Sequence, residues 1–166
     1  INELLRAFQR VNKVESECKL LLVGPLEPDL DPLSSESLTL LQTDPSILSV
    51  GYQNDVRPYF ALAHCLAFPS YREGFTNVVL QAGTMELPAI VSNINGCNEI
   101  IIPQQNGMII PVKDEEALYT AMLEMVQNKE RYQHFKDNAR SSITQRYEQK
   151  VIWEALLEEY RTFERD

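Results

Sequence analysis

Cysteine is scarce in this sequence and has no motif spacing. Its three occurrences, Cys18, Cys65 and Cys97, lie far apart, and no two of them are spaced as Cys-x-x-Cys. This pattern argues against a disulfide framework and against a structural zinc site, and it fits a reducing cytoplasm. Because each cysteine has apolar neighbours in the sequence, we expect buried structural thiols.

Long apolar runs are missing as well. No uninterrupted run approaches the ~18 residues that indicate a membrane span. The first residues, Ile1 to Arg6, lack the basic and then apolar order of a secretory signal. They have the pattern of a helix already under way, and there is no initiator methionine. We therefore expect a piece of a longer protein.

Positive charge is in deficit. The chain has 15 Lys and Arg against 24 Asp and Glu, for a formal net charge of −9. An acidic domain repels a phosphate backbone, so nucleic acid is not the expected partner. The 166 residues, 44% hydrophobic and 23% charged, fit one globular domain and exclude disorder as the main state.

Short apolar runs alternate with amphipathic stretches along most of the chain. The runs predict strands at 18–24, 47–51, 65–70, 88–92 and 107–111, and the stretches predict helices at 2–14, 34–41, 55–64, 75–87 and 96–102. We expect a loop over 25–35, Ser34 or Ser35 as one helix cap, and Asp55 as another with Pro58 in the first turn. From Asp114 onward the pattern predicts about three helices.

This order predicts an α/β fold: a Rossmann-like parallel sheet with helices on both faces and a helical C-terminal tail. Ligands bind such sheets beyond the carboxyl ends of the strands. The loops of interest therefore follow Val23, Val50, Phe68 and Val91.

The loop after Phe68 combines a carboxylate, Glu73, with a glycine, Gly74, just before a predicted helix. The free N–H groups at that helix start, those of Phe75, Thr76 and Asn77, form a ready anion site. The polar arc that continues along the helix also fits an ordinary solvated face.

The loop after Val91 repeats the arrangement, with Gly96 and, three residues later, Glu99. Two interpretations stay open here. One is a helix cap by Asn95, with Asn98 or Glu99 reaching back, and the other is ligand binding. Two such loops at adjacent strand ends are more informative than either one.

These motifs together resemble a known family. The string Phe68-Pro-Ser70-x-x-Glu73-Gly-Phe, then Pro88-x-Ile-Val-x-x-x-x-Gly96-x-x-Glu99, then Asn106-Gly107 and a helix opened by Asp114, is similar to the family-4 retaining glycosyltransferases of the GT-B fold. The resemblance runs over nearly the whole chain. It implies that residues 1–166 are the C-terminal donor-binding domain, without the first strand and without the N-terminal acceptor domain.

The resemblance also implies residue roles. Glu73, in the catalytic position, would contact hydroxyls of the donor sugar, and the amides of Gly74, Phe75, Thr76 and Asn77 would hold sugar and diphosphate oxygens. The second glutamate of the family's Glu-x7-Glu motif is replaced here by Gln81. Gln81 keeps an acceptor oxygen for the ribose and adds an NH2 donor.

Further donor-binding positions follow from the same resemblance. Gly24 and the segment Gly51-Tyr52-Gln53 would flank the nucleotide base. Tyr71 and Arg72 would lie near the base or the diphosphate, although Arg72 fits an exposed surface arginine equally well. Glu99 would lie near the donor. His64 and His134 are expected to be ordinary helix residues.

The implied activity is metal-independent transfer of a sugar from a nucleotide diphosphate, with no cofactor, in bacterial surface polysaccharide synthesis. The implied acceptor is a saccharide or a lipid-linked sugar, and the implied location is the cytoplasm, at the inner face of the membrane, with peripheral membrane association. Gln81 motivates an alternative, a non-catalytic interaction module. A sugar-nucleotide epimerase ranks last, because its Gly-x-Gly-x-x-Gly fingerprint is missing.

The end of the chain carries an apolar stripe. Ile152, Leu156, Tyr160 and Phe163 recur at helical spacing. Such a stripe is typical of core packing. The resemblance offers a second interpretation, since the last helix of GT-B enzymes tends to cross back onto the N-terminal domain.

Overall fold

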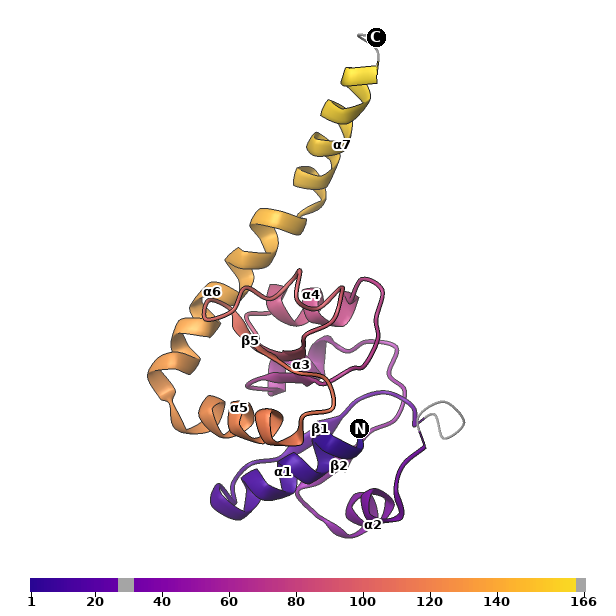
Figure 1. The fold of residues 1–166 in the computed structure, drawn as a ribbon, viewed down its shortest axis with the longest axis vertical. Coiled ribbons are helices and arrows are strands. Elements are labelled where there is room, and N and C mark those ends of the chain that lie inside the picture. The colour runs from indigo at the N-terminus through magenta and orange to yellow at the C-terminus, as the bar shows by residue number, and fades with distance from the viewer. Residues whose placement is uncertain (27–31, 164–166) are drawn as a thin grey trace.

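The computed structural model describes residues 1–26 and 32–163, and part of the expected 25–35 loop lies outside these residues. Helices and strands alternate up to β4, β5 follows β4 without an intervening helix, and three helices complete the described chain (Figure 1). In chain order the elements are α1 (Asn2–Val14), β1 (Leu20–Leu22), α2 (Ser35–Thr43), β2 (Ile47–Ser49), α3 (Arg57–Leu62), β3 (Leu66–Phe68), α4 (Asn77–Thr84), β4 (Ala89–Ser92), β5 (Gly107–Ile110), α5 (Glu115–Gln127), α6 (Lys129–Tyr147) and α7 (Gln149–Phe163).

All strand pairs are parallel, which confirms the predicted α/β class. The described strands form two sheets, β1-β2 and β3-β4-β5, where the sequence predicted one. Leu20 pairs with Ile47 in the first sheet, and Leu66 pairs with Ala89 in the second. Among the described residues, β1 and β3 therefore each end a sheet.

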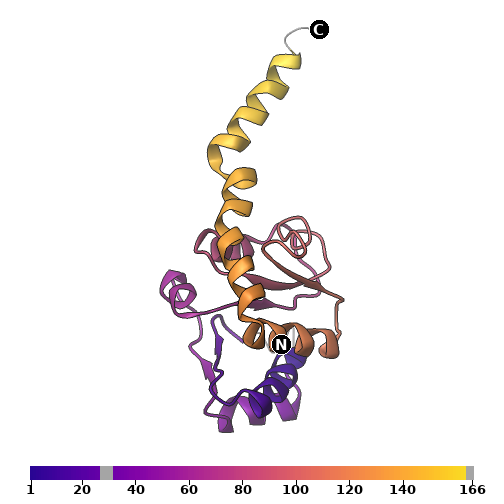
Figure 2. The same ribbon diagram turned by 90° about the vertical axis from the view of Figure 1, so that its left-hand side faces the viewer.

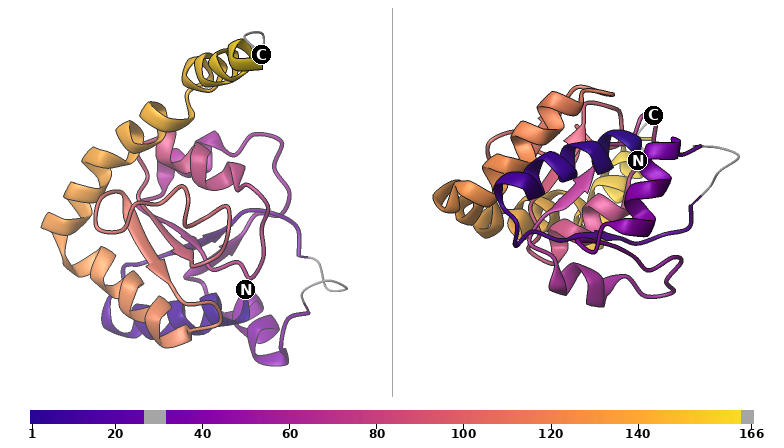
Figure 3. Two further views of the ribbon diagram at one scale, coloured as in Figure 1. Left: turned by 45° about the horizontal axis from the view of Figure 1, so that its top comes forward. Right: turned by 90° about the horizontal axis from the view of Figure 1, so that it is seen from below.

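Helices cover both faces of the larger sheet, as predicted. In β4, Ile90 packs in one core cluster with Phe8 of α1 and Leu118 of α5. The next residue, Val91, packs in another cluster with Ile143 of α6. Successive strand side chains point to opposite faces, so α1 and α5 lie on one side of the sheet and α6 on the other. Figure 3 shows α1 running beside α5.

Side chains cap several helices as the sequence predicted. Ser34 Oγ accepts a hydrogen bond from the N–H of Ser37 at the start of α2. The 55–64 helix is shorter than predicted: α3 begins at Arg57, with Val56 at the cap and Pro58 in the first turn. Asp55 therefore lies one residue before the N-cap position, although its carboxylate accepts from the backbone N–H and the guanidinium of Arg57, the first residue of α3. These hydrogen bonds lower the pKa of Asp55 to about 2.

The predicted helix over 96–102 is wrong. The segment forms successive turns, with N–H groups of Asn98 and Ile101 donating to carbonyls of Ile94 and Cys97. Gly96 has a φ of +78°, a left-handed conformation that an α-helix cannot contain. The 75–87 helix is also shorter than predicted, since α4 ends at Thr84 and Glu86 has a φ of +64°.

Helix α7 projects away from the rest of the molecule (Figures 1 and 2). None of its described residues is buried. Ile152, Leu156, Tyr160 and Phe163 are all exposed, so the prediction of core packing for this stripe is wrong.

Across residues 1–26 and 32–163, no helix combines the length and the apolar character that a membrane crossing requires.

Candidate functional site

The two glycine loops predicted as a site meet at the carboxyl ends of β3 and β4. A Cβ atom on Gly96 would lie 1.8 Å from the carbonyl oxygen of Gly74. That spacing leaves no room for any side chain at position 96. Since β3 and β4 are paired neighbours, the sheet itself brings the loops together.

Glu73, the predicted catalytic residue, is half-buried in the first loop. Its Oε1 accepts a hydrogen bond of 2.7 Å from the hydroxyl of Ser70, two residues after the end of β3. This bond restrains the carboxylate at the strand end. The sequence analysis did not assign Ser70 a role, although a hydroxyl three residues before a carboxylate was a local signal for such a contact.

The start of α4 follows directly. Thr76 is buried at the N-cap position, and its Oγ1 lies 3.4 Å from Cys97 Sγ. Asn77 and Gln81 are exposed and are four residues apart on one helix face. Glu73 thus lies just before the start of α4, and Gln81 is exposed one turn beyond Asn77 on the same helix.

The end of α6 supports both loops. The Phe75 ring is 50% exposed and packs 5.5 Å from the ring of Tyr147. The Tyr147 hydroxyl donates to the main-chain oxygen of Glu99 at 2.8 Å, and Arg146 donates to the same oxygen and to that of Ile100. Sequence analysis missed Arg146 and Tyr147, because nothing local links them to a loop 46 to 48 residues earlier.

The Glu99 side chain reaches back within its own turn. Its Oε1 accepts from the N–H of Gly96 at 3.5 Å, a long hydrogen bond. Asn98 donates instead to Asn93 Oδ1 at 2.9 Å. The Glu99 carboxylate therefore reaches back as the capping interpretation predicted, but it caps no helix because the segment forms turns. Its carboxylate is also exposed beside the loop contact.

Tyr71 joins the first loop to α1. Its hydroxyl donates to Glu3 Oε2 at 2.6 Å, and the ammonium of Lys113 lies 4.9 Å from its ring centroid. Burial alone would raise the pKa of Glu3, but the hydrogen bond from Tyr71 and nearby positive charge lower it on balance. The neighbouring Arg72 side chain is exposed.

The remaining predicted positions form a second group, at the carboxyl ends of β1 and β2. The N–H of Gly24 donates to the carbonyl of Gly51 at 2.9 Å, and both glycines have positive φ, +132° and +65°. Tyr52 is 71% exposed. The Gln53 amide donates to the carbonyl of Val50 at 2.8 Å, which fixes its orientation.

The cysteines are not nucleophiles in this arrangement. Cys97 is fully buried, whereas Cys18 and Cys65 are partly buried, so full burial was correctly predicted for one of the three. Burial raises the pKa of all three thiols, and that of Cys65 to about 12. A thiol held in its neutral form is a poor nucleophile.

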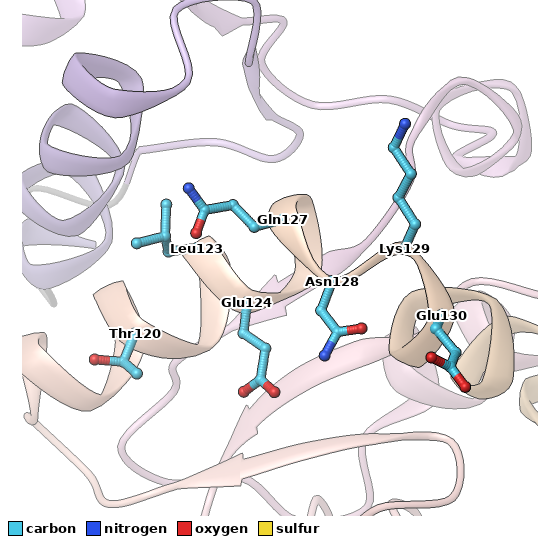
Figure 4. A pocket seen from close by; sticks show the side chains of 7 residues that line it. All are labelled: Thr120, Leu123, Glu124, Gln127, Asn128, Lys129 and Glu130. Atoms are coloured by element: carbon cyan, nitrogen blue, oxygen red, sulfur yellow. The ribbon is translucent and has the colours of Figure 1, made fainter.

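A hollow of about 630 Å³ lies elsewhere, at the junction of α5 and α6 (Figure 4). Glu124 and Asn128 point to one side of this junction and Lys129 to the other. The Glu124 carboxylate already pairs with Arg131. None of the predicted site residues lines this hollow.

Known proteins resemble the chain over most of its length. Residues 1–128 match the family model described as Glycosyl transferases group 1. The Staphylococcus aureus capsular polysaccharide biosynthesis glycosyltransferase CapM is 26% identical over 98% of this chain and 43% of its own length. The Bacillus anthracis N-acetyl-alpha-D-glucosaminyl L-malate synthase is 23% identical over 98% of this chain and 41% of its own. The chain thus spans less than half of these relatives.

Solved structures share the fold. Anabaena HepE in complex with UDP superposes with a TM-score of 0.84 at 18% identity, over 96% of this chain and 44% of that one. The C-terminal domain of the Francisella tularensis group 1 glycosyl transferase LpcC superposes with a TM-score of 0.78 at 19% identity, over 88% of this chain and 78% of that domain.

Proposed function

Because the chain belongs to the group 1 glycosyl transferases, we propose that it is the donor-binding domain of a retaining glycosyltransferase that uses a nucleotide-diphosphate sugar. One observation carries the proposal. Glu73, an uncapped helix start and the Gly96 loop come together at the carboxyl ends of two paired strands. Parallel α/β sheets bind their ligands at such ends.

In this proposal the donor diphosphate binds at the start of α4. The first amides of a helix have no acceptor within the helix, and the helix dipole favours negative charge there. The Glu73 carboxylate, restrained by Ser70, receives hydrogen bonds from the sugar hydroxyls. Arg72, which is exposed beside it, adds positive charge toward the departing diphosphate. Positioning and charge stabilisation then account for catalysis without a metal ion.

The nucleoside lies between the two groups of loops. Gln81 is exposed one turn beyond Asn77, where its amide can both accept from and donate to ribose hydroxyls. Gly24, Gly51, Tyr52 and Gln53 border the base. Within residues 1–26 and 32–163, and apart from the adjacent residues in the chain, no atom lies within 4 Å of a Cβ built on Gly24 or on Gly51, so a flat ring can approach both glycines. Tyr71 contacts the base through its ring, since its hydroxyl is held by Glu3.

The acceptor binds to a separate N-terminal domain that precedes this chain in the complete protein. A strand from that preceding segment fits between β1 and β3, because the classic doubly wound order places the first strand between the second and the fourth. The split into two sheets that end on β1 and β3 supports this proposal.

We also propose that the complete enzyme contributes to bacterial surface polysaccharide synthesis on the inner face of the cytoplasmic membrane. The name of the capsular polysaccharide relative supports this biological setting. The acceptor is then a saccharide or a lipid-linked sugar.

Calorimetric titration of the complete protein with UDP and with GDP tests the donor site. We expect one of the two to bind. Glu73→Ala should lower turnover of the matching nucleotide sugar by about 10- to 100-fold, the value of a hydrogen bond to a charged group. Glu130→Ala, an exposed carboxylate on α6, is the matched control and should leave turnover unchanged.

Three outcomes separate the alternatives. If neither UDP nor GDP binds and Glu73→Ala has normal turnover, the assignment of the donor site to Glu73 and the start of α4 is wrong. Binding of UDP or GDP without turnover of any nucleotide sugar points to the non-catalytic interaction module. Turnover of a nucleotide sugar excludes that module.

A further inference from the structure

The N-cap residue of α4, Thr76, is of a type suited to capping, but its side chain does not cap the helix. Side chains at the N-caps of α2, α5 and α6, namely Ser34, Asp114 and Asn128, each accept from a backbone N–H of the first turn. Threonine is likewise a favoured N-cap residue. Yet Thr76, at the N-cap of α4, makes no such side-chain bond.

The Thr76 hydroxyl is engaged elsewhere. Its Oγ1 shares a hydrogen bond of 3.4 Å with Cys97 Sγ, in which either atom can donate. Thr76 is 4% exposed and Cys97 is 0% exposed, so water does not compete for this bond. Cys97 follows Gly96, whose close approach to Gly74 fixes the distance between the two loops.

The bond has a direct effect on the helix start. The N–H groups of Val79 and Leu80 donate to the Thr76 carbonyl at 3.2 Å and 3.4 Å. In the described part of the chain, those of Asn77 and Val78 have no backbone acceptor. A capping hydroxyl accepts from the second or third N–H of a helix, which here are those of Val78 and Val79.

We propose that Cys97 is a positioning residue: it holds the Thr76 hydroxyl away from the start of α4 and so leaves the first amides of that helix free for an anionic ligand. The inference rests on the proposed function, in which the anion is the donor diphosphate. Cys97 touches no substrate in this arrangement and acts through Thr76.

Substitutions at Cys97 in the complete protein test the proposal, with UDP as the calorimetric probe. Cys97→Ala frees a buried hydroxyl that must then find another partner, and the first amides of α4, which follow Thr76 directly, are available donors. We expect UDP affinity to fall about fivefold, which is the factor that a capping bond of ordinary strength represents. Cys97→Ser, which restores a hydrogen-bonding partner, should recover most of the affinity. Cys18→Ala is the matched control, at a partly buried thiol that is distant in sequence from both loops.

A double variant distinguishes positioning from packing. Without the Thr76 hydroxyl no cap can form, so adding Cys97→Ala to a Thr76→Val protein should not lower affinity further. If Cys97→Ala weakens UDP binding equally in both backgrounds, the thiol only fills space and the proposal is overturned. Unchanged affinity in Cys97→Ala overturns it as well.

A measurement without ligand separates this inference from the proposed function. Amide hydrogen exchange at Val78 should slow in Cys97→Ala, because the freed hydroxyl protects it, and should return to the reference rate when Thr76→Val is added. If the wild type binds neither UDP nor GDP but exchange at Val78 changes in these variants as expected, the proposed function is wrong. The positioning role of Cys97 is then still supported. An unchanged exchange rate at Val78 in a folded Cys97→Ala protein refutes the positioning role of Cys97.

Discussion

At the scale of single residues, the candidate site is built from contacts between distant parts of the chain. Thr76 meets Cys97 across 21 residues, Glu99 meets Tyr147 across 48, and Glu3 meets Tyr71 across 68. Spacing along the sequence identified the loops, because strand ends and glycines are local features. It could not identify these partners, because no periodic pattern connects them.

Gly96→Ala should destabilise the fold. The new methyl group would overlap the Gly74 carbonyl, and φ at position 96 is +78°. We expect a loss of about 2 kcal/mol or more in the free energy of unfolding, which urea titration would measure. Gly74→Ala is the matched control, since nothing lies within 4 Å of a Cβ there. Equal losses in the two variants would contradict the close approach.

Tyr71→Phe should change how stability depends on pH. The hydrogen bond from Tyr71 helps keep the pKa of Glu3 below its ordinary value of 4.5 in the folded protein. A lowered carboxyl pKa contributes stability that is fully present above the unfolded pKa and is lost as pH falls through the folded pKa.

The wild type should therefore be more stable than Tyr71→Phe at pH 7, by no more than about 1 kcal/mol for a pair near the surface. That difference should shrink as the pH falls from 5 toward 3. Urea unfolding of both proteins at several pH values measures it. A difference that grows toward acid pH would contradict this assignment.

At the scale of elements, capping residues in the sequence predict where helices begin, but they do not distinguish a helix from a series of turns. Asp114 Oδ1 accepts from the N–H of Ala117 at 2.9 Å, as a local cap should. Asp114→Ala should lower the free energy of unfolding by about 1 kcal/mol, and Asp114→Asn should recover most of it, because the amide oxygen also accepts. Thermal or urea unfolding of the wild type and the two variants checks this order. Equal stability of all three proteins would show that the Asp114 cap does not stabilise α5.

The segment after β4 shows why the rest was missed. Cys97, Ile100 and Ile101 are buried at a spacing that an amphipathic helix also produces. The left-handed Gly96 prevents a regular helix there, and the Asn106 side chain accepts from the N–H of Ile102 to close the segment. The spacing of apolar residues thus fits the side chains that face the core, but it predicted the wrong backbone for them.

At the scale of the whole molecule, the sequence predicted the parallel α/β architecture and helices on both faces. It did not predict the division into two sheets, because pairing between strands that are distant in sequence leaves no local pattern. It also predicted core packing for the apolar stripe of α7, although none of the described residues of α7 is buried.

The chain of residues 1–166 should not transfer sugar by itself and should bind UDP or GDP weakly. It spans less than half of its curated relatives, and the proposed acceptor site belongs to the part that precedes it. Turnover assays that compare this chain with the complete protein check the prediction. Measurable transfer by the 166-residue chain would show that the acceptor site had been assigned to the wrong part of the protein.

The contact between Gly96 and Gly74 has a practical consequence for directed evolution of the proposed donor site. A library that randomises position 96 would consist mainly of destabilised members, since any side chain collides with the Gly74 carbonyl. Among the described residues the surroundings of Gly51 are open, and its φ of +65° still admits asparagine or aspartate at modest cost, whereas the φ of +132° at Gly24 lies outside the left-handed region that these residues adopt. Diversity is therefore better placed around Gly51, at the end of β2, with Gly74 and Gly96 held constant.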